Sequence, residues 1–174
     1  MYRRSAPHGD QEARRWYALV VMDRYMSAAI AEATSGVERG HGGPFGAVVV
    51  RDGTVVGRGH NEVVTHTDPT AHAEINAIRE ACRALGTFDL SGCELYTTCE
   101  PCPMCYAAAW WARISRIHYG CSRDDASGIG FDDAAIYDDL EGRTERRIPM
   151  EQLDRDACME PMRVWRRKPD RVPY

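Results

Sequence analysis

The sequence predicts an α/β fold in which a mixed β-sheet lies between two layers of helices, a three-layer helix-sheet-helix sandwich. Segments with strand-like patterns alternate with segments of helical periodicity, which is typical of this class. The 174 residues contain no Gly-, Ser- or Pro-rich linker that would divide them into two domains. A chain of this length buries a substantial core by itself, so we expect one compact domain.

The first elements expected are a helix and a β-hairpin. Apolar residues recur at helical spacing from Leu19 to Val37, and Gly40 follows as a natural stop, which predicts a helix through about residue 39. Segments 47–51 and 54–59 are strand-like, and Asp52-Gly53 between them supplies the positive φ of a tight turn. The apolar stripe of the helix needs a surface to pack on, and a sheet containing this hairpin provides it.

The next segments have the order of a βαβ unit. We expect a helix at about 73–85, a strand at 94–98, a helix at about 102–112 and a strand at 116–119. The two strands that flank the second of these helices should be parallel and joined by a right-handed crossover. Further along, residues 132–140 suggest another helix, and the charged segment 141–148 a surface connection.

Composition and charge limit the possible partners. The formal net charge of -4 opposes non-specific attraction to phosphate backbones and favours a small diffusible substrate over nucleic acid. The basic stretch 163–171 is the exception, and we interpret it as a solvated terminal helix or an oligomer contact. No apolar run approaches the roughly 18 residues of a membrane span, and the polar first fifteen residues lack a signal-peptide core. We expect a cytoplasmic protein with no membrane association.

The cysteines indicate metal binding instead of disulfides. There are seven, an odd number, and three of them are clustered between residues 99 and 105. In a chain without an export signal this favours reduced thiols and metal ligation. The four cysteines outside the cluster are predicted to be small core residues: Cys82, Cys93, Cys121 and Cys158.

Two short motifs predict a catalytic zinc site. His72 and Glu74 form an H-x-E motif, and Pro101, Cys102 and Cys105 form a P-C-x-x-C motif. This pair of motifs is typical of zinc-dependent nucleobase deaminases. Cys102 and Cys105 are three residues apart, so both can reach one ion. One histidine and two cysteines leave the fourth position of a tetrahedral zinc ion open for water, as catalytic sites do.

The same residues predict hydrolytic deamination. Zinc lowers the pKa of a bound water from about 15.7 to about 7. Glu74, two residues after the ligand His72, lies beside the metal and can carry protons from the water to a ring nitrogen and the leaving amine. Both motifs are expected to begin helices, so two helix N-termini would face one point and favour thiolate over thiol.

Other interpretations of these residues are possible. The run Cys99, Cys102, Cys105 resembles part of an iron-sulfur sequence, but no fourth cysteine follows at the expected spacing. A structural zinc that used Cys99 or Cys93 would leave Glu74 unexplained, so we expect Cys99 to be a neighbour and not a ligand. A zinc-binding interaction module without activity is the non-enzyme alternative. The remaining histidines have no spacing that favours metal ligation and are interpreted as surface or structural residues: His41, His60, His66 and His118.

These motifs resemble the cytidine deaminase-like superfamily of zinc deaminases, and most closely its bacterial guanine deaminases. The similarity covers about Gly40 to Tyr137, and the sequence Gly130-Phe131-Asp132-Asp133 is its more particular guanine deaminase feature. The resemblance implies a mixed, mostly five-stranded central sheet. With it we expect a catalytic domain at 25–155 and a C-terminal helix or tail at 156–174. The N-terminal extension at 1–24 departs from the family, because it is longer than the usual start. In the family the subunits form homodimers that exchange their C-terminal segments, with a terminal tyrosine near the partner's pocket.

The resemblance implies the role of each site residue. His72, Cys102 and Cys105 would bind one Zn²⁺ per subunit, and Glu74 would carry protons. The substrate contacts implied are Asn61, which would hydrogen-bond the base, Phe45 and Trp111, which would line the pocket, and Ala73, Asp133 and Tyr174. Simpler roles exist for several of them: core packing for Phe45 and Trp111, a helix N-cap for one of the two aspartates 132 and 133, and a turn at the strand end for Asn61.

The expected reaction converts guanine and water to xanthine and ammonia. Guanine presents N–H donors that the Asp133 carboxylate can accept, whereas adenine presents a ring acceptor at the corresponding edge and would be repelled. A guanosine deaminase would share the zinc motifs and stays open as the nearest alternative. Cytosine, adenine, a modified purine or a triazine are further alternatives. A tRNA adenosine deaminase should carry a basic face, which the net charge opposes.

Overall fold

The structure is a computed structural model that describes residues 23–131 and 133–173. The chain forms two compact units, Met1–Ser122 and Arg123–Tyr174. In the described ranges, no helix combines the length and the apolar character that crossing a membrane requires.

The first unit is built on a four-stranded mixed sheet. Its strands are β1 (Gly46–Arg51), β2 (Thr54–His60), β3 (Glu94–Cys99) and β4 (Arg116–Cys121), in the order β2-β1-β3-β4. β1 pairs antiparallel with β2 and with β3, and β3 pairs parallel with β4. The predicted hairpin and the predicted parallel pair are therefore confirmed. Asp52 and Gly53 connect β1 to β2 with φ values of 49° and 76°, as a tight hairpin turn requires.

The expectation of a fifth strand is wrong for the part of the chain that the structure describes. After β4 the chain forms the short helix α6 (Arg123–Ser127), whose first turn contains Asp124 and Asp125. Aspartates are favoured in the first turn of a helix and disfavoured in strands. No later described segment has the alternating apolar pattern of a half-buried strand, and the sheet ends at β4.

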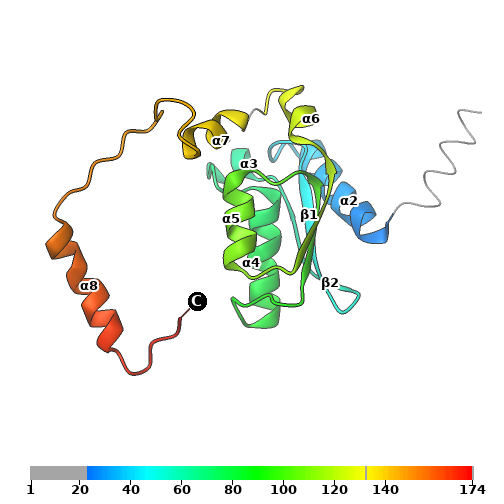
Figure 1. The fold of residues 1–174 in the computed structure, drawn as a ribbon. Helices are drawn as coiled ribbons and strands as arrows, with labels where there is room; N and C mark the ends of the chain where they lie inside the picture. The colour runs from blue at the N-terminus through cyan, green and yellow to red at the C-terminus, as the bar shows by residue number, and fades with distance from the viewer. Residues whose placement is uncertain (1–22, 132, 174) are drawn as a thin grey trace, which may run out of the picture. The chain divides into compact units, whose positions relative to one another are not determined.

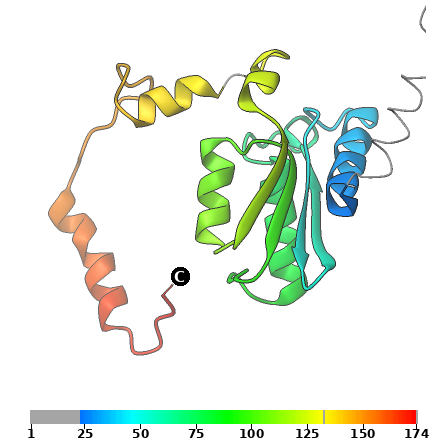
Figure 2. The ribbon, with the colours of Figure 1, turned by 45° about the vertical axis from the view of Figure 1, so that its right-hand side comes forward.

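Helices cover both faces of this sheet. Helix α2 (Arg24–Glu38) lies on one face, and α4 (Ala73–Leu85) and α5 (Pro103–Trp111) lie side by side on the other (Figures 1 and 2). The three-layer arrangement predicted from the sequence is thus present in the first unit. The Asp23 side chain caps α2 by accepting hydrogen bonds from the backbone N–H groups of Tyr25 and Met26. The part of the expected first helix before residue 23 lies outside the described residues.

Two glycines of β2 set how closely α4 approaches the sheet. A Cβ atom at Gly57 would lie 2.3 Å from the backbone oxygen of Ala77, and one at Gly59 would lie 2.5 Å from that of Ala73. The missing side chains let the helix backbone rest directly on the strand. This contact fixes the distance between the sheet and the first turn of α4. The H-x-E motif lies at this end of the helix, with His72 as its N-cap residue. The helix ends at Gly86, whose φ of 66° is the left-handed conformation common at helix C-termini.

The core lies between the sheet and the helices α4 and α5. It is formed by small and aliphatic side chains, and its fully buried members include Ala47, Val49, Ala77, Leu90 and Leu95. Cys93 is buried in this core and Cys82 packs partly buried against it, as predicted. Cys121 and Cys158 are exposed, so the prediction is wrong for both. Cys121 ends the edge strand β4, and Cys158 lies on a helix with no buried residue.

The second unit contains α6, α7 (Ala134–Leu140) and α8 (Arg155–Arg167). The helix expected at 132–140 is present as α7, and the charged segment after it has no regular structure up to α8. On α8, Glu160 pairs with Arg163 and Arg167, and these side chains are more than half exposed. The basic C-terminal stretch is therefore helical as far as Arg167, with solvated charges.

Candidate active site

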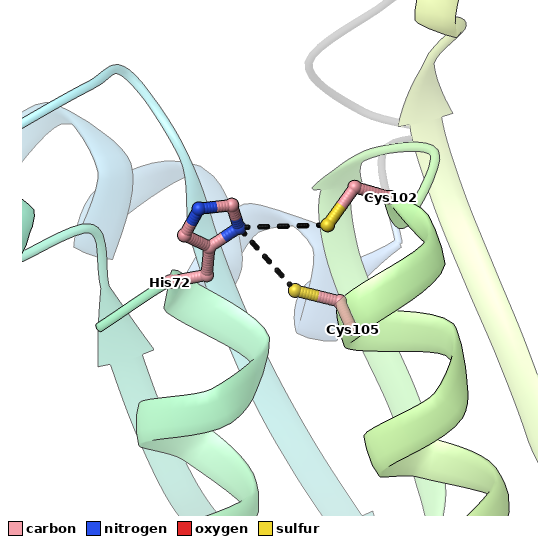
Figure 3. Close-up of side chains that lie close together, drawn as sticks. All are labelled: His72, Cys102 and Cys105. Carbon is pink, nitrogen blue, oxygen red and sulfur yellow. Dashed lines mark hydrogen bonds between the residues drawn. The ribbon is translucent and has the colours of Figure 1, made fainter. Parts of the chain in front are cut away.

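The structure brings the three predicted zinc ligands together. The Nδ1 atom of His72 lies 3.4 Å from Sγ of Cys105 and 3.7 Å from Sγ of Cys102. Figure 3 shows the imidazole of His72 and the two sulfur atoms pointing at one another from two adjacent helices. Cys105 is fully buried, and His72 and Cys102 are half-buried, so the cluster is reached from one side. Cys99 is buried but is not part of this cluster, as predicted.

Two helix N-termini position these ligands. His72 is the N-cap residue of α4 and Cys102 is the N-cap residue of α5, both with extended backbone. Pro103 occupies the first position of α5, where a residue without an N–H costs no hydrogen bond. Cys105 lies one turn later on the same helix. The convergence of the two helix N-termini that the sequence predicted is confirmed, and their dipoles favour thiolates at this point.

The donor atoms fit a zinc ion. With Zn–S of about 2.3 Å and Zn–N of about 2.1 Å, tetrahedral coordination separates a sulfur from a nitrogen ligand by about 3.6 Å. The two observed Sγ–Nδ1 distances, 3.4 and 3.7 Å, lie on either side of this value. His72, Cys102 and Cys105 can therefore hold Zn²⁺ with little movement, and three protein ligands leave a fourth position for water.

The protonation of the cluster follows from its internal contacts. A hydrogen bond with Cys105 is the main reason that the pKa of Cys102 falls to about 4, with a further contribution from His72. The same contact raises the pKa of Cys105, and the hydrogen bond with Cys102 raises the pKa of His72. One sulfur is thus held as thiolate before any metal binds, which is the form that zinc requires.

Glu74 is buried directly beside the ligands. Its Oε2 atom lies 3.4 Å from Sγ of Cys105, and its Oε1 atom accepts a hydrogen bond from Oγ1 of Thr97 at 3.3 Å. Only 6% of the Glu74 surface is exposed, and this burial raises the pKa of the carboxyl. The carboxyl is held against the metal position and away from bulk water, where it can exchange a proton with a metal-bound group.

Thr97 is a site residue that the motifs did not identify. It lies on β3, where burial alternates along the strand, and it is fully buried. A polar residue at a buried position of a strand requires a hydrogen-bond partner, and the partner here is Glu74. The sequence does contain a signal for this residue, because Thr97 is a polar residue at one of the alternate positions of β3 that face the core.

Asn61 is held at the end of β2 by the loop that precedes β1. Its Oδ1 atom accepts hydrogen bonds from the backbone N–H groups of Gly43 at 3.1 Å and Val63 at 3.3 Å. A Cβ atom at position 42 would lie 2.1 Å from the same oxygen, so Gly42 is needed for this approach. Asn61 is 4% exposed. Because its oxygen is occupied by backbone donors, the group that it can offer a ligand is the amide N–H.

The other residues expected to contact the substrate lie at several different places in the structure. Ala73 is buried at the first position of α4, and Phe45 packs partly buried against the core just before β1. Trp111 ends α5, nine residues after Cys102, which corresponds to about 13 Å along a helix; it is 57% exposed. Within this chain Trp111 is not brought together with the zinc ligands. Asp133 is the N-cap residue of α7 in the second unit, and Tyr174 lies outside the described residues.

Comparison with known proteins places the chain in a family. Residues 21–121 match the family model of the cytidine and deoxycytidylate deaminase zinc-binding region. A guanine deaminase of Bacillus subtilis is 44% identical over 153 residues, which cover 87% of this chain and 98% of that protein. A tRNA-specific adenosine deaminase of Aquifex aeolicus is 42% identical over 105 residues, 60% of this chain and 69% of that protein.

A solved structure agrees with these matches. The X-ray structure of a guanine deaminase from Bacillus subtilis has a TM-score of 0.83 and 43% identity, and the match covers 88% of this chain and 99% of the solved one. The similarity therefore includes the fold as well as the motifs. Together with the cluster of His72, Cys102 and Cys105, it shows that this chain is a zinc-dependent hydrolytic deaminase of the family defined by the cytidine and deoxycytidylate deaminase zinc-binding region.

Proposed function

We propose that this protein deaminates guanine hydrolytically to xanthine and ammonia. The observation that carries the proposal is the extent of the match: the Bacillus subtilis guanine deaminase aligns over 98% of its length, into the second unit of this chain. The tRNA-specific adenosine deaminase aligns over 105 residues only. The part of the chain beyond the zinc-binding region thus resembles the guanine enzyme, and that part contains Asp133.

The chain's own residues supply the proton transfers. Zinc bound to His72, Cys102 and Cys105 would supply a Lewis acid that makes water nucleophilic at neutral pH. Glu74 would take a proton from the attacking water and give protons to the ring nitrogen and to the departing amine. Its buried carboxyl beside Cys105 keeps these protons from exchanging with bulk solvent. The amine leaves as ammonia, and a carbonyl group takes its place on the ring.

Asn61 and Phe45 are proposed to orient the base. With Oδ1 occupied by Gly43 and Val63, Asn61 presents its amide N–H, which suits the O6 and N7 acceptors of guanine. The backbone N–H of Asn61 donates to the carbonyl of Phe45 at 3.0 Å, so the two residues are held next to each other. Ala73, at the start of α4, would allow the ring to approach Glu74 without a clash.

Asp133 is proposed to select guanine over adenine. A carboxylate only accepts hydrogen bonds, so it matches the ring N–H and exocyclic amine donors of guanine. Adenine has an unprotonated ring nitrogen at the corresponding edge, and two acceptors facing each other repel. The position of Asp133 just before α7 places it in the segment shared with the guanine deaminase of Bacillus subtilis.

We further propose a homodimer whose C-terminal segments, residues 156–174, are exchanged between catalytic domains of residues 25–155. The outer face of α5 supports association, because Tyr106 and Trp110 lie one turn apart and are 59% and 65% exposed. Trp111 and Tyr174 would then contribute to a pocket only in the assembled dimer. The cysteines are all free, which supports the cytoplasm as its compartment.

A substrate panel tests the proposed reaction. The purified protein with equimolar zinc is given guanine, guanosine, adenine, cytosine and a tRNA anticodon stem, and released ammonia is measured for each. We expect turnover of guanine at least 100-fold above the others. Turnover of guanosine without guanine would instead assign a nucleoside deaminase, and turnover of the RNA alone would assign a tRNA-editing enzyme. Ammonia from none of them would indicate a binding module.

A further inference from the structure

A second group of metal-ligating side chains lies away from the zinc ligands, where β2 ends. It consists of His41, in the loop after α2, His60, the last residue of β2, and Glu62, two residues later. Nδ1 of His41 lies 2.9 Å from Nε2 of His60, which lies 3.8 Å from Oε1 of Glu62. All three residues are partly buried, and the side chains of His60 and Glu62 are 13% and 24% exposed. None of them belongs to the deaminase motifs or to the contacts proposed for the substrate.

Neighbouring side chains orient His60 and Glu62 from the side that faces away from the other ligands. Nδ1 of His60 lies 3.5 Å from Oε2 of Glu32, so that carboxylate can accept its proton and leave Nε2 as the lone-pair nitrogen. Asn76 donates a hydrogen bond from Nδ2 to Oε2 of Glu62 at 2.9 Å, which orients Oε1 of Glu62 toward His60. Metal-binding histidines usually donate the N–H of their second ring nitrogen to a carboxylate or a carbonyl group, which fixes the orientation of the ring.

Close packing and backbone hydrogen bonds also fix the positions of His41 and His60. A Cβ atom at Gly36 would lie 2.7 Å from Cδ2 of His60, so the ring of His60 occupies the space that the glycine leaves on α2. The carbonyl of His41 accepts hydrogen bonds from the backbone N–H groups of Val64 and Thr65, both at 3.1 Å. The loop after α2 is thereby tied to α3 (Val63–His66), and the imidazole of His41 is held beside that of His60, with the ring centroids 5.1 Å apart.

We propose that His41, His60 and Glu62 form a second binding site for a divalent transition-metal ion such as Zn²⁺. Tetrahedral coordination at about 2.1 Å separates neighbouring nitrogen and oxygen ligands by about 3.4 Å. The two separations that involve His60, 2.9 and 3.8 Å, lie on either side of that value, and all three ligand atoms lie within 4.8 Å of one another, so side-chain movements would seat the ion. Two imidazoles and one carboxylate are a donor set that suits zinc and its neighbours in the first transition row.

The charges around the group favour a cation. Glu32 and Glu62 place two carboxylates against two imidazoles. Arg58 lies 3.6 Å from Oε1 of Glu32, and Nδ1 of His66 lies 3.9 Å from Oε2 of Glu62. When the ion binds, the proton of His41 moves from Nδ1 to Nε2, so the histidine coordinates without a change in charge. The ion replaces the hydrogen bond between the two imidazoles. It would then link the loop after α2 to the end of β2 on both sides of Asn61.

Cobalt titration distinguishes this site from the catalytic one. Co²⁺ bound by Cys102 and Cys105 gives an intense thiolate charge-transfer band, whereas Co²⁺ bound by two histidines and a carboxylate gives only weak visible bands. Full-length protein is first loaded with one equivalent of Zn²⁺ and dialysed against micromolar Co²⁺, and both metals are counted by elemental analysis. The variants are His41→Gln and His60→Gln. The control is His118→Gln, another half-buried histidine beside a carboxylate, Glu94.

We expect wild type and His118→Gln to bind one further equivalent of Co²⁺ without a thiolate band, and His41→Gln and His60→Gln to lose it. Each variant should keep its first equivalent of Zn²⁺, which shows that the first unit is folded. If His60→Gln also loses the first zinc ion, this variant is misfolded, and the Co²⁺ content of the loop variant His41→Gln decides whether the second site exists. A wild type that stays at one metal ion per chain would overturn the proposal, as would variants that still take up the second ion.

Discussion

The carboxylate of Glu74 lies 3.4 Å from the sulfur of Cys105, so the residue that we propose as proton carrier contacts a predicted zinc ligand that is 31 positions away in the sequence. The two residues reach this point from different helices, α4 and α5. Because both are buried, the contact is shielded from water and salt. The first predictions below concern this contact.

Replacing Glu74 by glutamine should abolish most turnover and leave the zinc in place. The amide keeps the shape of the side chain but cannot carry a proton, and a positioned acid-base group contributes about 10² to 10⁴ in rate. We expect kcat to fall by at least about 100-fold, with zinc content unchanged by elemental analysis. Glu80→Gln, an exposed glutamate on the same helix, is the matched control. Near-normal turnover in Glu74→Gln would exclude the assigned role.

Replacing Cys105 by serine should remove the zinc. A hydroxyl does not ionise to a metal ligand at neutral pH, and the change leaves two protein ligands at the site. We expect zinc content and ammonia release to fall together, and a chelator to do the same to the wild type until Zn²⁺ is added back. Cys121→Ser, at an exposed cysteine, should keep both. Full zinc content in Cys105→Ser would show that the ligand set is different.

Replacing Asn61 by aspartate should weaken substrate binding and keep the loop intact. The aspartate keeps an oxygen for the N–H groups of Gly43 and Val63 but loses the amide donor. We expect KM for guanine to rise about 10-fold or more, since a lost hydrogen bond to a ligand costs about 1 to 3 kcal/mol. Asn61→Ala loses the oxygen as well, so its melting temperature should fall below that of the aspartate variant. An unchanged KM in Asn61→Asp would remove Asn61 from the substrate contacts.

Replacing Gly57 by alanine should destabilise the first unit. The new Cβ would lie 2.3 Å from the backbone oxygen of Ala77, so α4 would have to move away from β2. We expect a loss of about 1 to 3 kcal/mol in the free energy of unfolding, measured by urea denaturation. At Gly128 the nearest atom would be 3.3 Å away, so Gly128→Ala serves as the control with more room. Equal stability of the two variants would contradict the close packing.

Acid should weaken the contact between Glu94 and His118. Nε2 of His118 lies 2.6 Å from Oε2 of Glu94, and this hydrogen bond is the main reason that the pKa of Glu94 falls below its ordinary value of 4.5. A carboxyl with a lowered pKa contributes stability above its ordinary pKa and loses it as the pH falls through the folded-state pKa. The stability difference between wild type and Glu94→Gln should therefore be present at pH 7 and shrink below about pH 4.5.

The matched control for this titration is Glu38→Gln, which removes one exposed negative charge from α2. Urea unfolding of the three proteins at a series of pH values separates the contact from the change in net charge. A difference between wild type and Glu94→Gln that stays constant with pH would contradict the role of His118.

Much of the catalytic site was determined by the sequence alone. His72, Glu74, Cys102 and Cys105 stand in short motifs. The spacing of three residues between Cys102 and Cys105 lets both reach one ion at the start of a helix. The order of helices and strands up to β4 was predicted for the same reason, because periodicity and turn residues are local signals. The sequence therefore determined the zinc chemistry and the layers that position it.

Only the tertiary structure decided the contacts between distant segments. Thr97 on β3 supports Glu74, and His41 contacts His60, 19 positions away in the sequence. The strand pattern indicates that Thr97 is buried, but which partner each residue meets depends on how strands, helices and loops pack. The number of strands in the sheet was likewise decided by packing. The length of α5 places Trp111 at the helix end opposite Cys102. The spacing of residues in the sequence determines which side chains lie at the same helix end. Which side chains from distant segments come into contact depends on packing, such as the close approach of β2 and α4 that the small residues of β2 allow.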